Sequence, residues 1–299
     1  EFEEQLNDRD AEAEVDFQKW VAEASKDVSG ETLLPSGAAL HLTLDEALAD
    51  LVDLDRKVEV KGKTLWADGK FGKAFQLDGG NWIDLGQAAD FDHTDGFSYG
   101  AWIKPQGDAN GTVLAKMDND AAYRGFDMLF GAGKLSVHII NTWPTNAIKV
   151  NTKGKLKKDE WQHVFVTYDG SSKAAGVKIY FNGKPQEWTI EQDRLSATIR
   201  AKVPLYVGRR STNAPFKGLV DEVRVYPRAL SETDVQALAG SDPIRPLLAV
   251  KPDERTPEQS RVLRAHYLTS LDVPYQETLK QVAALKASIA ASAKPVSTV

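Results

Sequence analysis

The chain has 299 residues, of which 42% are hydrophobic, and this is enough for one large core or two smaller ones. Its 37 basic and 43 acidic residues give a net charge of −6, so it lacks the basic excess that a nucleic-acid partner would require. Cysteine is absent, which excludes disulfides, thiolate metal sites, a catalytic thiol and covalently attached c-type haem, and no apolar run reaches the roughly 20 residues of a membrane span.

The first 30 residues have the spacing of an amphipathic helix. In EFEEQLNDRDAEAEVDFQKWVAEASKD the apolar residues recur three, four or seven positions apart, and many of the others are acidic. We therefore predict one helix with an acidic outer face over residues 1–30, which SGETLLPSG ends. The chain starts at Glu1 and finishes on AKPVSTV without a structural stop, so we expect it to be part of a longer protein.

Residues 31–240 consist of short alternating segments separated by Gly, Asn and Asp turns. Examples are FSYGAWIKP (97–105), HVFVTYDG (163–170) and GLVDEVRVY (218–226). FNGK (181–184) contains Asn-Gly, which is a strong signal for a tight hairpin. Many short strands with no long helix predict a mainly β domain, a two-sheet jelly-roll sandwich of about a dozen strands.

Helical spacing returns over residues 241–299. Thr256, Pro257 and Gln259 form the pattern of a capping box with proline at the first helical position. A second apolar stripe follows on a predicted helix of about twenty residues. It consists of Tyr275, Leu279, Val282, Leu285 and Ile289.

The apolar stripes of the helices at the two ends of the chain must each pack against another element, because an isolated amphipathic helix is only marginally stable in water. We favour an antiparallel helical hairpin, in which the segment 241–299 packs on the N-terminal helix and the β-domain is inserted between them. The alternative is that each helix docks separately on the β-domain.

Four blocks of the β-region resemble the laminin-G-like, concanavalin A-type jelly roll and occur in the order of that family. They are GKAFQLDGGNWIDLG (72–86), DGFSYGAWIKP (95–105), DEWQHVFVTYDGSSKAAGVKIYFNGKP (159–185) and PLYVGRRSTNAPFKGLVDEVRVYPRALSETDVQAL (204–238). The resemblance implies two curved antiparallel sheets.

A second resemblance concerns VHIINTWPTNAIKV (137–150) and the segment 256–299. Both are similar to large planctomycetal cytochrome c-type proteins, in which a laminin-G-like insert lies between two domains of uncharacterised function. This resemblance implies that the chain is the middle piece of such a protein, without its haem module. It also implies export to the periplasm or cell envelope, and it implies no reaction.

Asp221 stands out in the last predicted strand. It falls on the same face of the strand as Leu219, Val223 and Val225, which occupy every second position. This predicts that its carboxylate faces the core and needs a compensating partner. Three partners are open: a calcium ion, an arginine such as Arg224 or Arg228, or backbone N–H groups.

The resemblance to jelly-roll lectins and glucanases implies a structural calcium ion at Asp221. Its other ligands would be Asp45 and carbonyl groups near Gly72. The segment ALADLVDLD departs from the Asp-rich turn that the family often has after its first strand. Calcium and a hydrogen-bonded structural aspartate therefore both stay open.

The same family resemblance implies sugar binding, in which an aromatic ring stacks on the apolar face of a pyranose. Trp143 is the first candidate, because a tryptophan before Pro144 in a loop cannot easily enter the core. The other candidate ligand residues are Tyr123, Trp188 and Arg209. The alternative for Trp143 is to cap one end of the sandwich or to contact a neighbouring domain. We expect core packing for Trp82, Trp102 and Trp161.

The sequence offers little for catalysis. Glucanases of this fold use a Glu-x-Asp-x-x-Glu strand, and the nearest match, EAEVDF (12–17), lies in the predicted helix. His138 and His163 occur singly and are expected to be structural, and no Ser-His-Asp order is found. Asp118 and Asp120 resemble part of a calcium loop, but a solvated turn is the preferred interpretation.

We therefore expect a non-catalytic binding or docking module of a larger cell-envelope protein. Its candidate ligands are a glycan and the flanking domains of the parent protein. The alternatives are a purely structural spacer and a polysaccharide-active enzyme.

Overall fold

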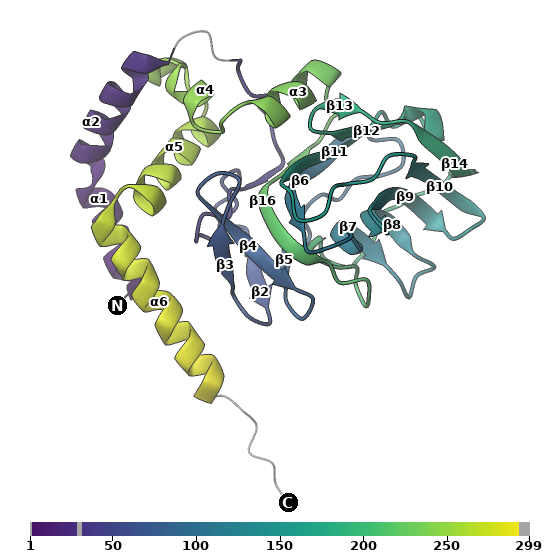
Figure 1. Cartoon of the computed structure of the whole chain (residues 1–299), viewed down its shortest axis with the longest axis horizontal. Coiled ribbons are helices and arrows are strands. Elements are labelled where there is room, and N and C mark those ends of the chain that lie inside the picture. Colours follow the sequence, from purple (N-terminus) through teal and green to yellow (C-terminus); the bar gives the residue numbers. More distant parts are fainter. Residues whose placement is uncertain (1, 29–31, 293–299) are drawn as a thin grey trace, which may run out of the picture. The chain divides into compact units, whose positions relative to one another are not determined.

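The computed structural model describes residues 2–28 and 32–292, and the chain divides into two compact units (Figure 1). The β-unit spans Thr32–Pro243, and the helical unit combines Glu1–Glu31 with Ile244–Val299.

The β-unit contains two eight-stranded antiparallel sheets. The first sheet has the order β13-β12-β11-β6-β16-β4-β3, and β1 also pairs with β16. Its strands are β1 (Leu40–Leu42), β3 (Trp66–Asp68), β4 (Lys73–Asp78), β6 (Phe97–Pro105), β11 (Gln162–Tyr168), β12 (Val177–Phe181), β13 (Lys184–Pro185) and β16 (Lys217–Tyr226).

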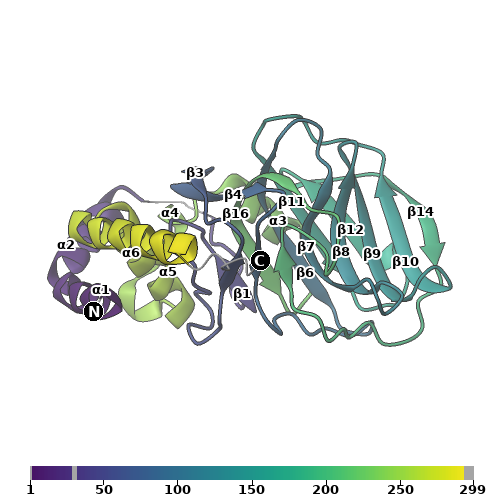
Figure 2. The ribbon, with the colours of Figure 1, turned by 90° about the horizontal axis from the view of Figure 1, so that it is seen from below.

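The second sheet has the order β14-β10-β9-β8-β7-β15-β5-β2, and β7 to β10 run side by side in it (Figure 2). Its strands are β2 (Glu59–Lys61), β5 (Trp82–Asp84), β7 (Gly111–Asp118), β8 (Arg124–Gly131), β9 (Lys134–Thr142), β10 (Asn146–Thr152), β14 (Trp188–Asp193) and β15 (Tyr206–Val207). The predicted mainly β, two-sheet jelly-roll sandwich is confirmed.

Alternate residues of both sheets fill one shared core. Phe126 and Ile139 enter it from the second sheet, and Tyr99 and Val225 enter it from the first. The Tyr99 hydroxyl donates to the backbone carbonyl of Asp127 across this core, over 2.9 Å. Each intervening residue therefore points to the outer face of its sheet.

Strand β16 contains a bulge that changes which residues face the core. The register shifts between Asp221 and Arg224, and Glu222 adopts a positive φ of 51°. Val220 and Val223 lie in the core, whereas Asp221 pairs with the outward-facing Trp102. The prediction that Asp221 faces the core was therefore wrong, because the extra residue of a bulge reverses the alternation beyond it.

The helical unit contains α1 (Phe2–Glu12), α2 (Glu14–Ala24), α4 (Arg245–Leu248), α5 (Pro257–Ser270) and α6 (Val273–Ser292). The single helix predicted over residues 1–30 is therefore two helices that meet at Ala13, although Ala13 N–H still bonds to Arg9 O over 3.0 Å. Residues 29–31 lie outside the described residues. Within the described part of the chain, no helix has the length and apolar character to cross a membrane.

Helices from the two ends of the chain pack on each other. Arg9 Nε donates to Asp272 Oδ1 over 3.0 Å, and Arg264 Nε donates to Asp10 Oδ1 over 2.7 Å. In Figure 1, α1 and then α2 rise from the N-terminus while α5 and α6 descend, which is the arrangement of an antiparallel hairpin. The apolar stripe of α6 is only partly buried, because the Leu285 side chain remains 44% exposed.

Candidate functional site

A row of side chains crosses the outer face of the second sheet, with one residue from each neighbouring strand. Successive members are direct cross-strand partners, so their side chains lie on the same face. From β5 to β10 the row reads Asp84, Tyr206, Ala115, Asp127, His138 and Lys149. Ala115, between Tyr206 and Asp127 in this row, is fully buried.

Asp127 is the anchor of this face and has no solvent exposure. Its Oδ1 lies 2.7 Å from His138 Nδ1, and its Oδ2 accepts a hydrogen bond from Arg210 Nε over 2.6 Å. Burial opposes ionisation, but the charges and hydrogen bonds of His138 and Arg210 keep the pKa of Asp127 below its ordinary value. The carboxylate therefore stays charged and fixes both partners in place.

Tyr123 and Trp143 lie beside the two partners of this anchor. Both pack, half-buried, against a small apolar cluster on the same face, which consists of Ala115, Met117, Ile140 and Ala147. The Arg210 guanidinium lies 5.6 Å from the Tyr123 ring centroid, and the His138 ring meets Trp143 edge-on at 6.0 Å. Lys149 Nζ lies 5.3 Å from the Trp143 ring. The fold thus brings two of the predicted ligand residues together over a charged network.

The other two predicted ligand residues lie elsewhere. Arg209 stacks on Trp82 at 4.4 Å, and its Nε donates to the carbonyl of Arg210. Trp188 packs against the main core, so it does not belong to the candidate surface.

Two of the three tryptophans that were expected in the core face outward instead. Ile83 fills the core position next to Trp82, and Ala101 and Ile103 do the same beside Trp102. Because side chains alternate along a strand, both tryptophans must face outward. Trp161 precedes β11 and is half-buried.

Asp127 and Arg210 were not among the site residues predicted from the sequence. An available signal was the carboxylate at the second position of the otherwise apolar run FDMLF (126–130), since such a group requires a cationic partner. The identity of that partner depends on the fold, because Arg210 is 83 positions away.

Asp221 lies on the outer face of the first sheet, although it is fully buried. Its Oδ2 accepts hydrogen bonds from the backbone N–H groups of Lys70 and Phe71, over 2.8 and 3.0 Å. Its Oδ1 is buried without a hydrogen-bond partner. Burial, with the nearby negative charges of Glu222 and Asp45, raises the pKa of Asp221 to about 9.

Neither arginine that was predicted as a partner reaches Asp221. Arg224 pairs with Glu222, and Arg228 pairs with Asp234. Three partners for the Asp221 carboxylate were considered from the sequence, and the structure contains one of them, the backbone N–H groups. These groups donate hydrogen bonds to Oδ2 and leave Oδ1 without a hydrogen bond.

The surroundings of Asp221 include a second carboxylate, that of Asp45. Asp45 Oδ1 accepts from Lys73 N–H over 2.7 Å, and burial raises the pKa of Asp45 to about 7. Gly72 has a φ of +51°, and a Cβ there would lie 2.2 Å from Asp45 Oδ1, so only glycine leaves this space open. Within residues 2–28 and 32–292, no group of three or more His, Asp or Glu side chains could hold a metal ion.

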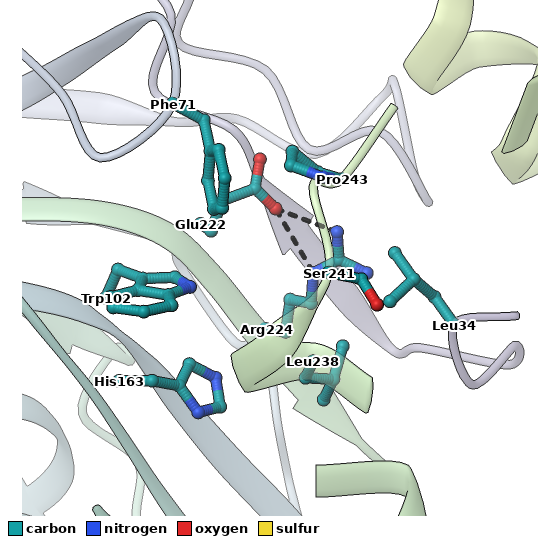
Figure 3. A pocket seen from close by; sticks show the side chains of 9 residues that line it. All are labelled: Leu34, Phe71, Trp102, His163, Glu222, Arg224, Leu238, Ser241 and Pro243. Atoms are coloured by element: carbon teal, nitrogen blue, oxygen red, sulfur yellow. Dashed lines mark hydrogen bonds and ion pairs between the residues drawn. The ribbon is translucent and has the colours of Figure 1, made fainter. Parts of the chain in front are cut away.

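A small hollow lies beside Glu222 on the same face (Figure 3). Glu222 Oε2 accepts from Arg224 over 2.8 Å and lies 3.0 Å from His41 Nε2. Burial, with the charge of Arg224, lowers the pKa of His163 to about 3, so this ring is neutral. The hollow measures about 10 Å³, which is room for one water molecule and too little for an organic ligand.

The acidic loop after β7 forms a turn, as expected. Asp118 Oδ1 accepts hydrogen bonds from the N–H groups of Asp120 and Ala121, over 3.1 and 3.2 Å. The EAEVDF segment lies at the junction of α1 and α2, which belong to the helical unit.

Comparison with known proteins bears on the β-unit. A family model described as the concanavalin A-like lectin/glucanases superfamily, in its laminin G branch, matches residues 77–236. No curated protein matches the chain.

Several solved structures are similar to 68% of the chain. Domain 4 of AbnA, a GH43 extracellular arabinanase from Geobacillus stearothermophilus, in complex with arabinotriose, is 24% identical, with a TM-score of 0.53 and 98% of that chain covered. The binding domain of Paraclostridial Mosquitocidal Protein 1 is 18% identical (TM-score 0.54, 52% covered), and that of botulinum neurotoxin serotype C1 is 16% identical (TM-score 0.53, 52% covered). These likenesses show the fold.

Proposed function

The chain belongs to the laminin G-like branch of the concanavalin A-like lectin/glucanases superfamily, and from this premise we propose that it is a non-catalytic carbohydrate-binding module. The observation that carries the proposal is the pair Trp143 and Tyr123, held half-buried over the fixed network of Asp127. The similar arabinanase domain, whose structure holds arabinotriose, supports the ligand class.

The proposed surface combines the two elements of sugar recognition. The Trp143 ring supplies an apolar platform, and two polar side chains stand beside it: Lys149 and Glu191, with Lys149 Nζ donating to Glu191 Oε1 over 2.9 Å. Such paired groups donate to and accept from the hydroxyls of a sugar whose apolar face lies on the ring. Asp127 is fully buried and paired with Arg210, so it cannot act as a general acid or nucleophile.

Isothermal titration calorimetry with arabinotriose and a panel of other neutral oligosaccharides tests this proposal. We expect at least one to bind, and Trp143→Ala to weaken it about tenfold, since stacking on an aromatic ring contributes about 1.4 kcal/mol. Leu54→Ala, which removes a 62% exposed side chain in the loop before β2, is the control and should bind normally. If no oligosaccharide binds, the structural spacer becomes the better interpretation.

We also propose that a calcium ion is held by Asp221, Asp45 and backbone carbonyl groups near Gly72. The buried Asp221 Oδ1 without a hydrogen-bond partner supports this proposal. Calcium at 100 times its dissociation constant would stabilise the fold by about 2.7 kcal/mol. The melting temperature of the EDTA-treated protein should therefore rise when calcium is added, and Asp221→Asn should abolish this rise. An equal rise in that variant would place the ion elsewhere.

A further proposal concerns the parent protein and its location in the cell. We propose that the chain is part of a larger protein of the periplasm or cell envelope and that it also docks on flanking domains of that protein. The resemblance to planctomycetal cytochrome c-type proteins motivates this. Fractionation of cells that produce the parent protein tests it, and recovery in the cytosol would contradict it.

A further inference from the structure

A second hollow lies on the outer face of the first sheet, away from the surface proposed for glycans. It measures about 170 Å³. Its floor is a cross-strand row in which Leu219 of β16 lies between Gln76 of β4 and Lys104 of β6. Its volume suits a single sugar-sized molecule.

Close packing of the backbone keeps this hollow in place. Gly218, at the start of β16, has a φ of +150°, and a Cβ there would lie 2.4 Å from the carbonyl oxygen of Lys104. Gln106 N–H donates to the carbonyl of Lys217 over 3.0 Å and ties the end of β6 to the same strand. The lining is therefore set by β4, β6 and β16, which are paired strands, rather than by a loop alone.

The lining of the hollow is amphipathic. Leu219 and Pro105 supply apolar surface, and Gln76, Gln106 and Asp159 supply amide and carboxylate groups. Lys104 is half-buried there, and no carboxylate of the described residues forms an ion pair with it. A lysine that lines a hollow without a counter-ion favours an anionic ligand, and the amides and Asp159 suit hydroxyl groups.

We propose that this hollow binds one hydroxylated carboxylate of monosaccharide size, such as a uronic acid, with its carboxylate on Lys104. This site is separate from Trp143 and does not depend on the glycan surface proposed above. It would allow the module to recognise an acidic unit on the face opposite to that surface.

The test uses methyl β-glucuronide and methyl β-glucoside, which differ in the carboxylate, in ligand-observed NMR titrations of the full chain. We expect the glucuronide to bind about tenfold more tightly than the glucoside. Lys104→Met should remove this preference, and Lys104→Arg, which keeps the charge, should retain it. Lys178→Met is the matched control, because Lys178 is an exposed lysine on the same face of the same sheet.

Three outcomes would overturn the proposal: equal affinity for the two glycosides, unchanged glucuronide binding in Lys104→Met, or no binding of either. Trp143→Ala separates this site from the other one. Loss of oligosaccharide binding with retained glucuronide binding would support both proposals independently.

Discussion

Asp127 and Asp221 are both buried carboxylates on outer faces of the sandwich, but their partners differ. Asp127 has Arg210 and His138 and stays ionised. Asp221 has only backbone donors on one oxygen, and its pKa is raised to about 9. The first is therefore a permanent ion pair, and the second requires a proton or a cation at neutral pH.

Removal of the charge of Asp127 should be strongly destabilising. In Asp127→Asn, Arg210 would remain 8% exposed without its counter-ion, and the loss of one partner of a buried pair costs about 3–5 kcal/mol. Urea denaturation measures this free energy of unfolding. Asp120→Asn, in the exposed turn after β7, is the control, and an equal loss there would contradict the buried-pair account.

The stability of the calcium-free protein should fall as the pH rises from about 4 toward 9. In this range the folded chain keeps the proton of Asp221, whose pKa is about 9, whereas the unfolded chain, at its ordinary value near 3.8, has released it. Ionisation is therefore easier in the unfolded state. Urea midpoints in EDTA between pH 5 and 8 should fall more steeply for the native chain than for Asp221→Asn. If the urea midpoints of the two proteins fell equally with pH, Asp221 would not be the cause of the pH dependence.

At the scale of single elements, capping residues define several boundaries. Thr256 accepts from Gln259 N–H while the Gln259 side chain accepts from Thr256 N–H, so the predicted capping box of α5 is confirmed. Ser231 and Asp234 form the same motif at the start of α3 (Glu232–Gly240).

Loss of the α5 cap should weaken the helical unit. Thr256→Ala would remove one acceptor of the box and cost about 1 kcal/mol. Thermal unfolding followed by circular dichroism measures the change. Thr278→Ala, on the exposed part of α6, is the comparison, and an equal effect there would argue against capping as the cause.

At the scale of the whole molecule, the two units have separate cores. In the helical unit, the Phe17 ring meets Tyr267 at 5.6 Å and lies under the Arg264 guanidinium. The β-unit has its own core between the two sheets. A substitution that weakens one core should therefore lower the local stability of its own unit first.

Phe17→Ala should loosen the helical unit selectively. Deletion of a buried phenylalanine ring costs about 3 kcal/mol, and this cost falls on the packing of α2 against α5. Hydrogen exchange should increase in residues 2–28 and 257–292 while the strands of the β-unit keep their protection. Val15→Ala, at a 64% exposed position in the same helix, should change neither. Equal loss of protection in both units would show that they unfold together.

Local patterns were sufficient to predict the main architecture. Alternation and turn residues identified the sandwich, helical spacing and the Thr256 box identified the flanking helices, and the position before Pro144 singled out Trp143. These features depend on neighbouring residues, which the sequence displays directly. Only the tertiary structure decided that Asp221 faces outward, because one added residue at Glu222 reverses the alternation. It alone also paired Asp127 with Arg210 and placed Lys104 beside a hollow, since these contacts join strands that are distant in sequence.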